Sequence, residues 1–271
     1  MRPDPQNILP SSDFRWKMRM RSGRPSPFFA PVGADGKLQE ERLRWLDQNP
    51  ERCLAEAKQG ARLLEQCADL AVRWTGSAPS RDEGLLTGLG KFWEADFLLL
   101  NRQDFTLAAG CVCLPSSWSL QDSIGKTLTE IHGRVPELNP SIGSSIERFL
   151  GRLPPDQIFY RENWSLTRSG DLNYHPDLQR PKLCSGISEN ELFFRIEHQA
   201  FAKLPDGVLM GIRIEPIPIT DLSQDIAFLQ NLHQQLATMP TAVATYKSLH
   251  DGIPRILEIL EDLIRQQDFT S

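Results

Sequence analysis

The residues of this chain whose types can do chemistry are concentrated in one segment, residues 108–136, which holds two cysteines, a tryptophan, a Gly-Lys pair and His132. The run Ser-x-Gly-Lys-Thr at 123–127 ends like a phosphate-binding loop, but that motif requires a glycine where this chain has Leu120. Cys111 and Cys113 have no second Cys or His pair at zinc-site spacing. We therefore interpret both cysteines as small residues of a core strand and expect neither a nucleotide site nor a zinc site.

Six short motifs within and beyond this segment stand out: Pro115-Ser116-Ser117-Trp118, Ile124-Gly125-Lys126, Ile131-His132-Gly133-Arg134-Val135-Pro136, Arg161-Glu162-Asn163-Trp164, Arg195-Ile196-Glu197-His198-Gln199 and Leu204-Pro205. Through these motifs the chain resembles the haem-dependent oxidative N-demethylase alpha-subunit-like family. The resemblance covers roughly residues 14–220, and its elements are specific only when taken together. Ala95, which separates Glu94 from Asp96, departs from the adjacent acidic pair of the family.

The resemblance implies a haem b cofactor and oxidative N-demethylation of a small methylated amine with oxygen, which releases formaldehyde. It also implies a separate NADPH-dependent flavin and iron–sulfur reductase, because this chain has neither a Gly-x-Gly-x-x-Gly motif nor a Cys₄ cluster spacing. The alternative is a non-enzymatic PAS-like haem or small-ligand sensor. A third possibility is an interaction protein that keeps the scaffold without haem.

His132 is the candidate axial ligand of the haem iron, since it lies in the best-matched motif and in an expected Gly-containing loop. The alternative is that His132 caps a turn through a backbone carbonyl. The resemblance makes Lys126, Arg134 and Arg161 the expected anchors of the haem propionates. His198, on the apolar face of an expected strand, is the competing ligand. The other histidines are expected in a surface loop or on helices outside the matched region: His175, His233 and His250.

Arg195, Glu197 and Gln199 alternate along an expected strand and so share one face. If that face is buried, these polar groups must be paired. We expect a hydrogen-bonded network in which Glu197 neutralises Arg195, and the alternative is a pocket floor that holds a propionate or a substrate amine. The same alternation places Arg161 and Trp164 on opposite faces of the preceding strand.

The periodicity predicts an α+β fold, an antiparallel sheet flanked by N-terminal and C-terminal helices, and the resemblance implies that this sheet is PAS-like. Helices are expected over 39–47, 50–75, 141–150, 221–237, 242–250 and 253–267. Strands are expected over 105–114, 159–167, 192–201 and 208–215, with a helix or strand at 91–100 and a polar connector at 76–90. Pro205-Asp206-Gly207 predicts a hairpin turn. We divide the chain into an extended arm (1–36), the family domain (37–220) and a helical extension (221–271).

The composition is that of an ordinary globular protein, with 40% hydrophobic and 24% charged residues among 271. The net charge of −5 argues against nucleic acid as a partner. The arm is nevertheless basic, and we interpret it as a disordered or docking segment, with an RNA contact as the alternative. The cations concentrated near its middle are Arg15, Lys17, Arg19, Arg21 and Arg24.

The sequence predicts no membrane segment, because no apolar run approaches the length of about 20 residues that spans a bilayer. The N-terminus has no apolar stretch typical of a secretory signal. The five cysteines are therefore expected as reduced thiols of a cytoplasmic protein.

Overall fold

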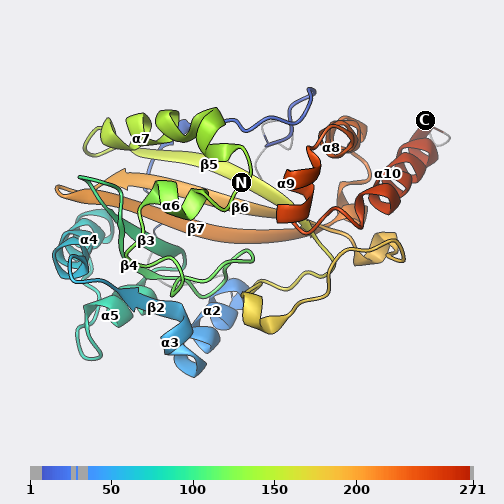
Figure 1. Ribbon diagram of the computed structural model, residues 1–271. Coiled ribbons are helices and arrows are strands. Elements are labelled where there is room, and N and C mark those ends of the chain that lie inside the picture. Colours follow the sequence, from blue (N-terminus) through green and yellow to red (C-terminus); the bar gives the residue numbers. More distant parts are fainter. Residues whose placement is uncertain (1–7, 26–28, 30–35, 269–271) are drawn as a thin grey trace.

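The computed structural model describes all residues except 1–7, 26–28, 30–35 and 269–271 (Figure 1). The described residues form a seven-stranded antiparallel sheet in the order β1-β5-β6-β7-β3-β4-β2 with helices packed around it, which confirms the α+β class. The strands are β1 (Arg21–Gly23), β2 (Leu54–Glu56), β3 (Asp96–Asn101), β4 (Leu107–Cys111), β5 (Ile158–Thr167), β6 (Phe193–Lys203) and β7 (Gly207–Pro218).

The helices cluster at the two ends of the sheet, with α4 and α5 at one end and α8, α9 and α10 at the other (Figure 1). No described helix combines the length and apolarity that crossing a membrane requires. The helices are α2 (Gly36–Gln48), α3 (Pro50–Cys53), α4 (Gly60–Thr75), α5 (Leu85–Phe92), α6 (Leu128–His132), α7 (Ser144–Gly151), α8 (Ile226–Ala237), α9 (Thr241–Tyr246) and α10 (Ile253–Asp268), and a π-helical turn at Asn139–Gly143 precedes α7.

The three longest strands form where alternation predicted them. The β6–β7 hairpin turns at residues 204–207, with Leu204 N–H donating to the Gly207 carbonyl at 2.9 Å. Strand β5 pairs with β6 over its whole length, from Ile158 opposite Ala202 to Thr167 opposite Phe193.

The alternation along β6 assigns α7 and α8 to opposite faces of the sheet. Phe201 contacts Phe149 of α7, with ring centroids 6.3 Å apart. Phe194 contacts Phe228 of α8, with centroids 5.0 Å apart. Because positions 194 and 201 differ by an odd number, their side chains point to opposite faces. Arg161, Glu197 and Gln199 share the α7 face, since the register pairs Arg161 with Gln199.

The helix expected over 50–75 is wrong in its first third. After α3 the chain forms β2, whose Leu54 and Glu56 pair with Cys111 and Ala109 of β4, and α4 begins only at Gly60. The pairing partner lies more than 50 residues away, so the local helical spacing of 50–75 carried no sign of it. The connector expected over 76–90 likewise contains most of α5, and β3 occupies the second half of 91–100.

Two local features depend on single residues. Pro50 occupies the first turn of α3 after Asn49, although the Asn49 side chain makes no capping hydrogen bond. Gly110 marks a close approach within the sheet, because a Cβ at this position would lie 2.9 Å from the Phe97 carbonyl oxygen.

The described part of the arm, residues 8–25, lies along the body. Over 11–20, exposed and half-buried residues alternate strictly, the pattern of an extended chain. The backbone N–H of Phe14 donates to Thr238 Oγ1 at 2.9 Å, and β1 pairs with β5. The prolines at 3, 5, 27 and 31, which contributed to the expectation of an arm, lie outside the described residues.

Candidate functional site

His132 is the last residue of α6, not part of a loop as the sequence predicted. The helix begins with a capping box in which the Thr127 side chain accepts from Glu130 N–H and the Glu130 carboxylate accepts from Thr127 N–H at 2.7 Å. These bonds satisfy donors that a short helix otherwise leaves unpaired. Thr127 and Glu130 therefore determine where His132 sits.

The His132 imidazole lies on the same side of the sheet as Arg161 of β5 and within its electrostatic reach. Burial, with the Arg161 charge adding to it, lowers the pKa of His132 to about 4. The imidazole is therefore neutral at physiological pH, and in that form a ring nitrogen can bind a metal.

Arg161 is a half-buried cation whose Nε is fully buried. Among the described residues this Nε has no hydrogen-bond partner. Burial lowers the pKa of the guanidinium, while the carboxylates of Glu197 and Glu162 act in the opposite direction. A buried polar group is costly unless it is paired, so Arg161 Nε keeps unused donor capacity.

Lys247, which directly follows α9, brings a second cation to Arg161. The pKa of Lys247 is lowered to about 8, chiefly by burial. The Glu197 charge opposes this shift and the Arg161 charge adds to it. The ammonium donates to the Trp164 carbonyl oxygen at 2.7 Å and lies 5.8 and 5.4 Å from the ring centroids of Trp16 and Trp164. These contacts connect the arm, β5 and the C-terminal helices at one point.

A hollow separates the arm from the edge of β5, and we call it the arm–strand hollow. Arg161 and Lys247 line it together with the arm cations Arg15, Lys17 and Arg19. Its other lining residues are Ile8, Pro10, Phe14, Trp16, Glu162, Asn163, Trp164 and Gln235. The hollow therefore joins the molecular surface to the buried cations.

The other two expected propionate anchors lie apart from Arg161. Lys126 precedes α6, at the opposite end from His132, and its charge acts on the exposed carboxylate of Glu130. Arg134 is exposed and lies within electrostatic reach of Tyr246, which is 47% exposed. Of the three cations, only Arg161 is brought to His132.

The expected Arg195–Glu197 pair does not form among the described residues. Arg195 instead donates to Ser116 Oγ at 3.1 Å and to the carbonyl oxygens of Asp171, Leu172 and Pro115, at 3.0, 2.7 and 3.4 Å. Arg195 therefore holds the loop that precedes β6.

Glu197 accepts a hydrogen bond from Gln199 and lies near Arg161 and Lys247. The Glu197 charge also acts on Arg195, whose pKa it raises against the effect of burial. Glu197 is therefore shared between Arg195 and the two cations Arg161 and Lys247.

His198 lies on the opposite face of the sheet from Arg161, because neighbouring positions on β6 alternate. Its Nε2 lies 3.0 Å from Glu215 and its Nδ1 lies 3.9 Å from Glu162. Burial lowers the pKa of His198, but the two carboxylates outweigh it and the pKa is raised. An imidazole held by two carboxylates in this way is a poor competitor for a metal.

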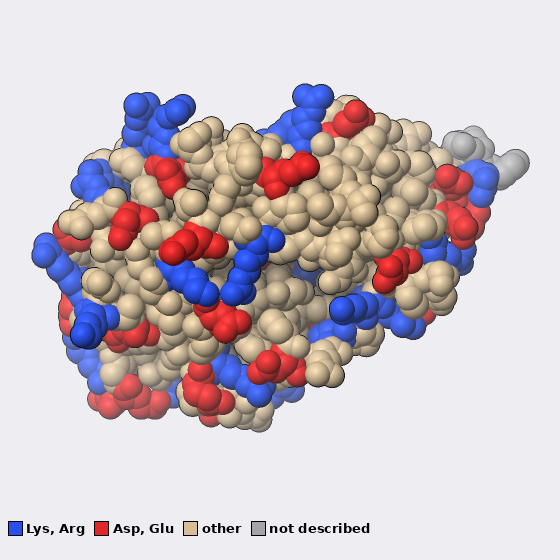
Figure 2. Space-filling view, in the orientation of Figure 1, with Lys and Arg blue, Asp and Glu red and all other residues tan. Residues whose placement is uncertain are grey.

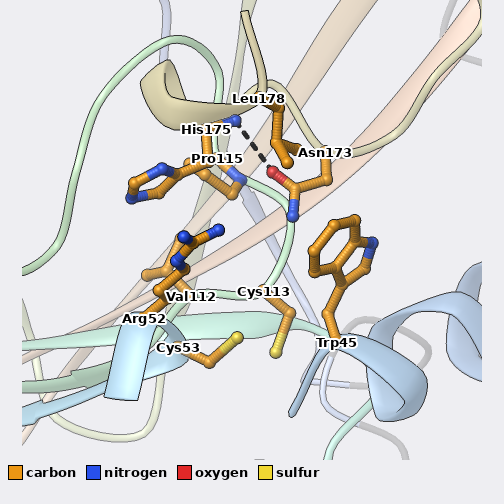
Figure 3. Close-up of a pocket in the computed structure, with 9 residues that line it drawn as sticks. All are labelled: Trp45, Arg52, Cys53, Val112, Cys113, Pro115, Asn173, His175 and Leu178. Carbon is orange, nitrogen blue, oxygen red and sulfur yellow. Dashed lines mark hydrogen bonds between the residues drawn. The ribbon is translucent and has the colours of Figure 1, made fainter. Parts of the chain in front are cut away.

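His175 is buried, so the expected surface-loop position is wrong. The His175 Nδ1 accepts from the backbone N–H of Asp177 at 3.3 Å. The backbone N–H of His175 donates to Asn173 Oδ1 at 2.8 Å (Figure 3). Both bonds fold the chain locally around a small pocket that also includes Cys53 and Cys113. His175 is thus a structural residue of this loop.

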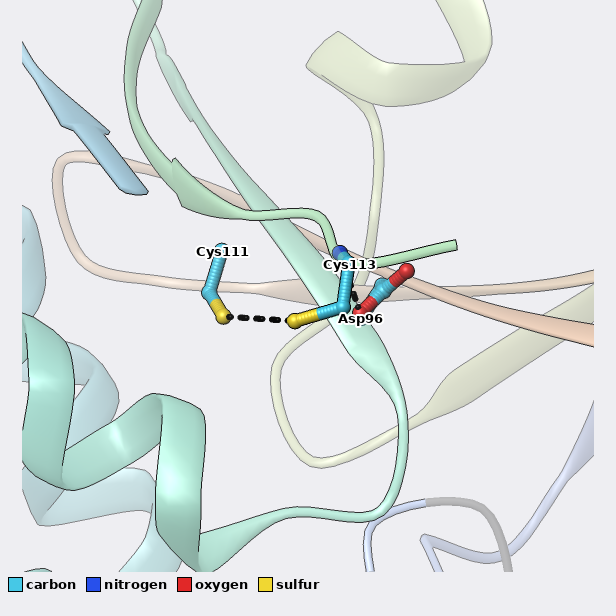
Figure 4. A group of neighbouring side chains, drawn as sticks. All are labelled: Asp96, Cys111 and Cys113. Carbon is cyan, nitrogen blue, oxygen red and sulfur yellow. Dashed lines mark hydrogen bonds between the residues drawn. The ribbon is translucent and has the colours of Figure 1, made fainter. Parts of the chain in front are cut away.

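Asp96, Cys111 and Cys113 form a buried group whose ligand atoms lie within 4.8 Å of one another (Figure 4). Asp96 is already saturated, since it accepts from Arg42 Nε at 2.8 Å and from the backbone N–H groups of Cys113 and Leu114. Arg42 Nη2 also approaches Cys111 Sγ at 3.2 Å. The fully buried Arg42 therefore takes the place that a metal ion would need.

A model of the haem-dependent oxidative N-demethylase, alpha subunit-like family matches residues 57–256. The chain belongs to this family. The family name implies haem dependence, and an alpha subunit implies a partner subunit. The match extends past residue 220, where the resemblance in the sequence ended, and so includes Lys247 within the family region.

Sequence reasoning missed Lys247 because it lies in a segment interpreted as an amphipathic helix outside the family motifs. The only local signal was a lysine at the expected end of a short helix, which is a common surface position. Its burial depends on Trp16 and Trp164, which are distant in sequence.

Proposed function

We propose that this member of the family is a haem-binding oxidoreductase that demethylates a small methylated amine. The observation that carries the proposal is the unpaired buried donor of Arg161 next to the neutral imidazole of His132. A ligand that offers both a metal ion and carboxylates matches this combination, and haem is such a ligand. The order of the central strands, β4-β3-β7-β6-β5, is consistent with a PAS-like core for that cofactor.

The residues present fit the cofactor that the family name implies. His132 would hold the iron, and its low pKa keeps the lone pair of a ring nitrogen available over the physiological range. Arg161 would pair with a propionate, and Lys247 would add a second positive charge. Arg134, at the exposed rim near Tyr246, would receive a carboxylate that extends toward solvent.

When bound, haem would supply the site for oxygen activation and for oxidation of the amine. This chain would then have to bind the substrate, and Glu197 is the carboxylate placed to do so. A methylated ammonium group would pair with Glu197 once Arg161 is neutralised by a propionate. The electrons would come from the partner subunit, proposed here as the NADPH-dependent flavin and iron–sulfur reductase.

The ligand role of His132 is tested by reconstituting the full chain with haemin and recording its absorption spectrum. We expect a stoichiometric Soret band that collapses or shifts in His132→Ala. His250→Ala is the matched control, because His250 is exposed. Far-UV circular dichroism should be unchanged in both variants. A spectrum unaffected by His132→Ala would contradict the proposed ligand.

The enzymatic part is tested separately, by measuring formaldehyde released from dimethylamine in the presence of oxygen and a chemical or enzymatic electron source. Release that depends on haem and is lost in His132→Ala supports an enzyme. A protein that binds haem through His132 but releases no formaldehyde from any small methylated amine would instead be a haem sensor or binding module.

A further inference from the structure

The arm presents a row of cations on a rigid support. Over 14–20 the side chains that face the body are apolar, with Phe14, Trp16, Met18 and Met20 half-buried. The intervening residues point outward and are all basic. We call this row the basic ridge: Arg15, Lys17, Arg19, Arg21 and Arg24.

The ridge has a defined geometry because the arm is fixed at several points. The Trp16 indole N–H donates to the Pro136 carbonyl at 2.9 Å, and Gln234 Nε2 donates to Asp13 at 2.7 Å. Strand β1 continues the ridge into the sheet. In an extended chain alternate side chains are about 6.7 Å apart, so the cations from Arg15 to Arg21 span roughly 20 Å.

The ridge carries an excess of positive charge. Residues 8–25 contain five basic residues and one acidic residue, Asp13, in a chain whose net charge is −5. Arg21 pairs with Glu162, whereas Arg15, Lys17 and Arg24 have no carboxylate within 4 Å in the described part of the chain. Over most of the face shown in Figure 2, by comparison, basic and acidic side chains are interspersed.

The ridge lines the same hollow as two cations of the candidate site. Arg15, Lys17 and Arg19 line the arm–strand hollow, and Arg161 and Lys247 line it too. A molecule seated on the ridge would therefore cover the entrance to the buried cations. This continuity distinguishes the ridge from an ordinary solvated charge run.

We propose that the basic ridge is the docking surface for an acidic protein, the chemistry that an electron-donating partner subunit would need here. The role of this partner as electron donor rests on the proposed function. Its acidic character is inferred from the ridge alone. A single-stranded nucleic acid fits less well, because such ligands stack on exposed aromatic rings, and Phe14 and Trp16 face the body.

The test compares two triple charge reversals in the full chain. Arg15→Glu, Lys17→Glu and Arg19→Glu together remove the ridge. Lys58→Glu, Arg102→Glu and Lys182→Glu change the net charge equally at exposed positions outside the arm. Binding of fluorescein-labelled poly-L-glutamate and of single-stranded oligodeoxythymidine is followed by fluorescence anisotropy, at low and at physiological ionic strength.

We expect the native chain to bind poly-L-glutamate at low ionic strength, and the ridge variant to bind at least about tenfold more weakly. The control variant should stay within about threefold of the native chain. Equal losses in the two variants, absence of binding by the native chain, or tighter binding of oligodeoxythymidine would each overturn the proposal. Haem content is measured in the same samples, so that failure of the docking proposal and failure of the proposed function can be distinguished. A chain that takes up no haem, yet loses poly-L-glutamate binding in the ridge variant, would refute only the proposed function.

Discussion

Replacing Arg161 by Met should stabilise the ligand-free chain and weaken its binding of haem. Methionine keeps the length and packing of the side chain but removes a buried charge whose Nε has no partner among the described residues. The two effects have opposite signs only if Arg161 serves a ligand. A purely structural arginine would instead lower stability when it is removed.

The magnitude of the gain follows from the partners that Arg161 has. Replacing a whole buried ion pair by apolar residues of similar volume can stabilise a protein by about 1–4 kcal/mol, whereas removing one partner destabilises it when the other is left without a counter-charge. Glu197 and Glu162 offset part of the cost of burying Arg161. Neither is left without a cation in Arg161→Met, because Arg21 still binds Glu162 and Lys247 still interacts with Glu197. We therefore expect about 1 kcal/mol, which corresponds to a rise in Tm of roughly 2–4 °C for a domain of this size.

The loss in binding follows from the pair that Arg161 would make with a propionate. A hydrogen bond to a charged group contributes about 1.5–3 kcal/mol, so the Kd for haem should rise roughly ten- to a hundredfold. The pKa of His132 should also rise, because the Arg161 charge is one of the causes that lower it. This shift can be followed by NMR titration of the ligand-free protein.

The matched control is Arg134→Met, which removes an exposed cation at the rim. It should change the free energy of unfolding by no more than about 0.5 kcal/mol. Thermal denaturation and haemin titration are performed on both variants. A fall in Tm for Arg161→Met, or an unchanged Kd for haem, would show that Arg161 does not bind an anionic ligand.

Three further predictions concern residues around this site and the core. As pH drops from 6.5 to 4, the unfolding free energy of the ligand-free native chain should fall by about 2–3 kcal/mol more than that of His132→Asn, because the imidazole protonates in the unfolded chain and stays largely neutral in the folded one. Urea denaturation at a series of pH values measures both free energies. Parallel pH curves for the two proteins would contradict this expectation. Asp96→Asn should cost about 3–5 kcal/mol, since it leaves the fully buried Arg42 uncompensated; chemical denaturation measures the cost, and a loss below about 1 kcal/mol would show that the pair is dispensable. Glu197→Gln should lower the Tm only slightly, because Arg195 keeps its hydrogen bonds to Ser116 and to three carbonyl oxygens, yet it should lose formaldehyde release; a variant with a much lower Tm would return Glu197 to a structural role.

The sequence by itself determined those features of the chain that depend on local periodicity. Alternation located the hairpin around residues 204–207 and placed Arg161 and Trp164 on opposite faces of β5. It did so because the side chains of any extended strand alternate, whatever the strand pairs with. The family motifs likewise singled out His132, Lys126, Arg134 and Arg161 as candidate residues, and in the structure the charge of Arg161 acts on His132.

Only the tertiary structure decided which of the candidate residues meet. Lys126 lies at the end of α6 opposite His132, and Arg195 donates its hydrogen bonds to loop residues. Lys247 lies close to Arg161 although more than eighty residues separate them in the sequence. The tertiary structure also turned part of an expected helix into β2, because pairing with β4 outweighed local helical spacing. These outcomes depend on contacts between residues far apart in sequence and on which charged side chains are desolvated. The spacing of residues along the chain does not determine either.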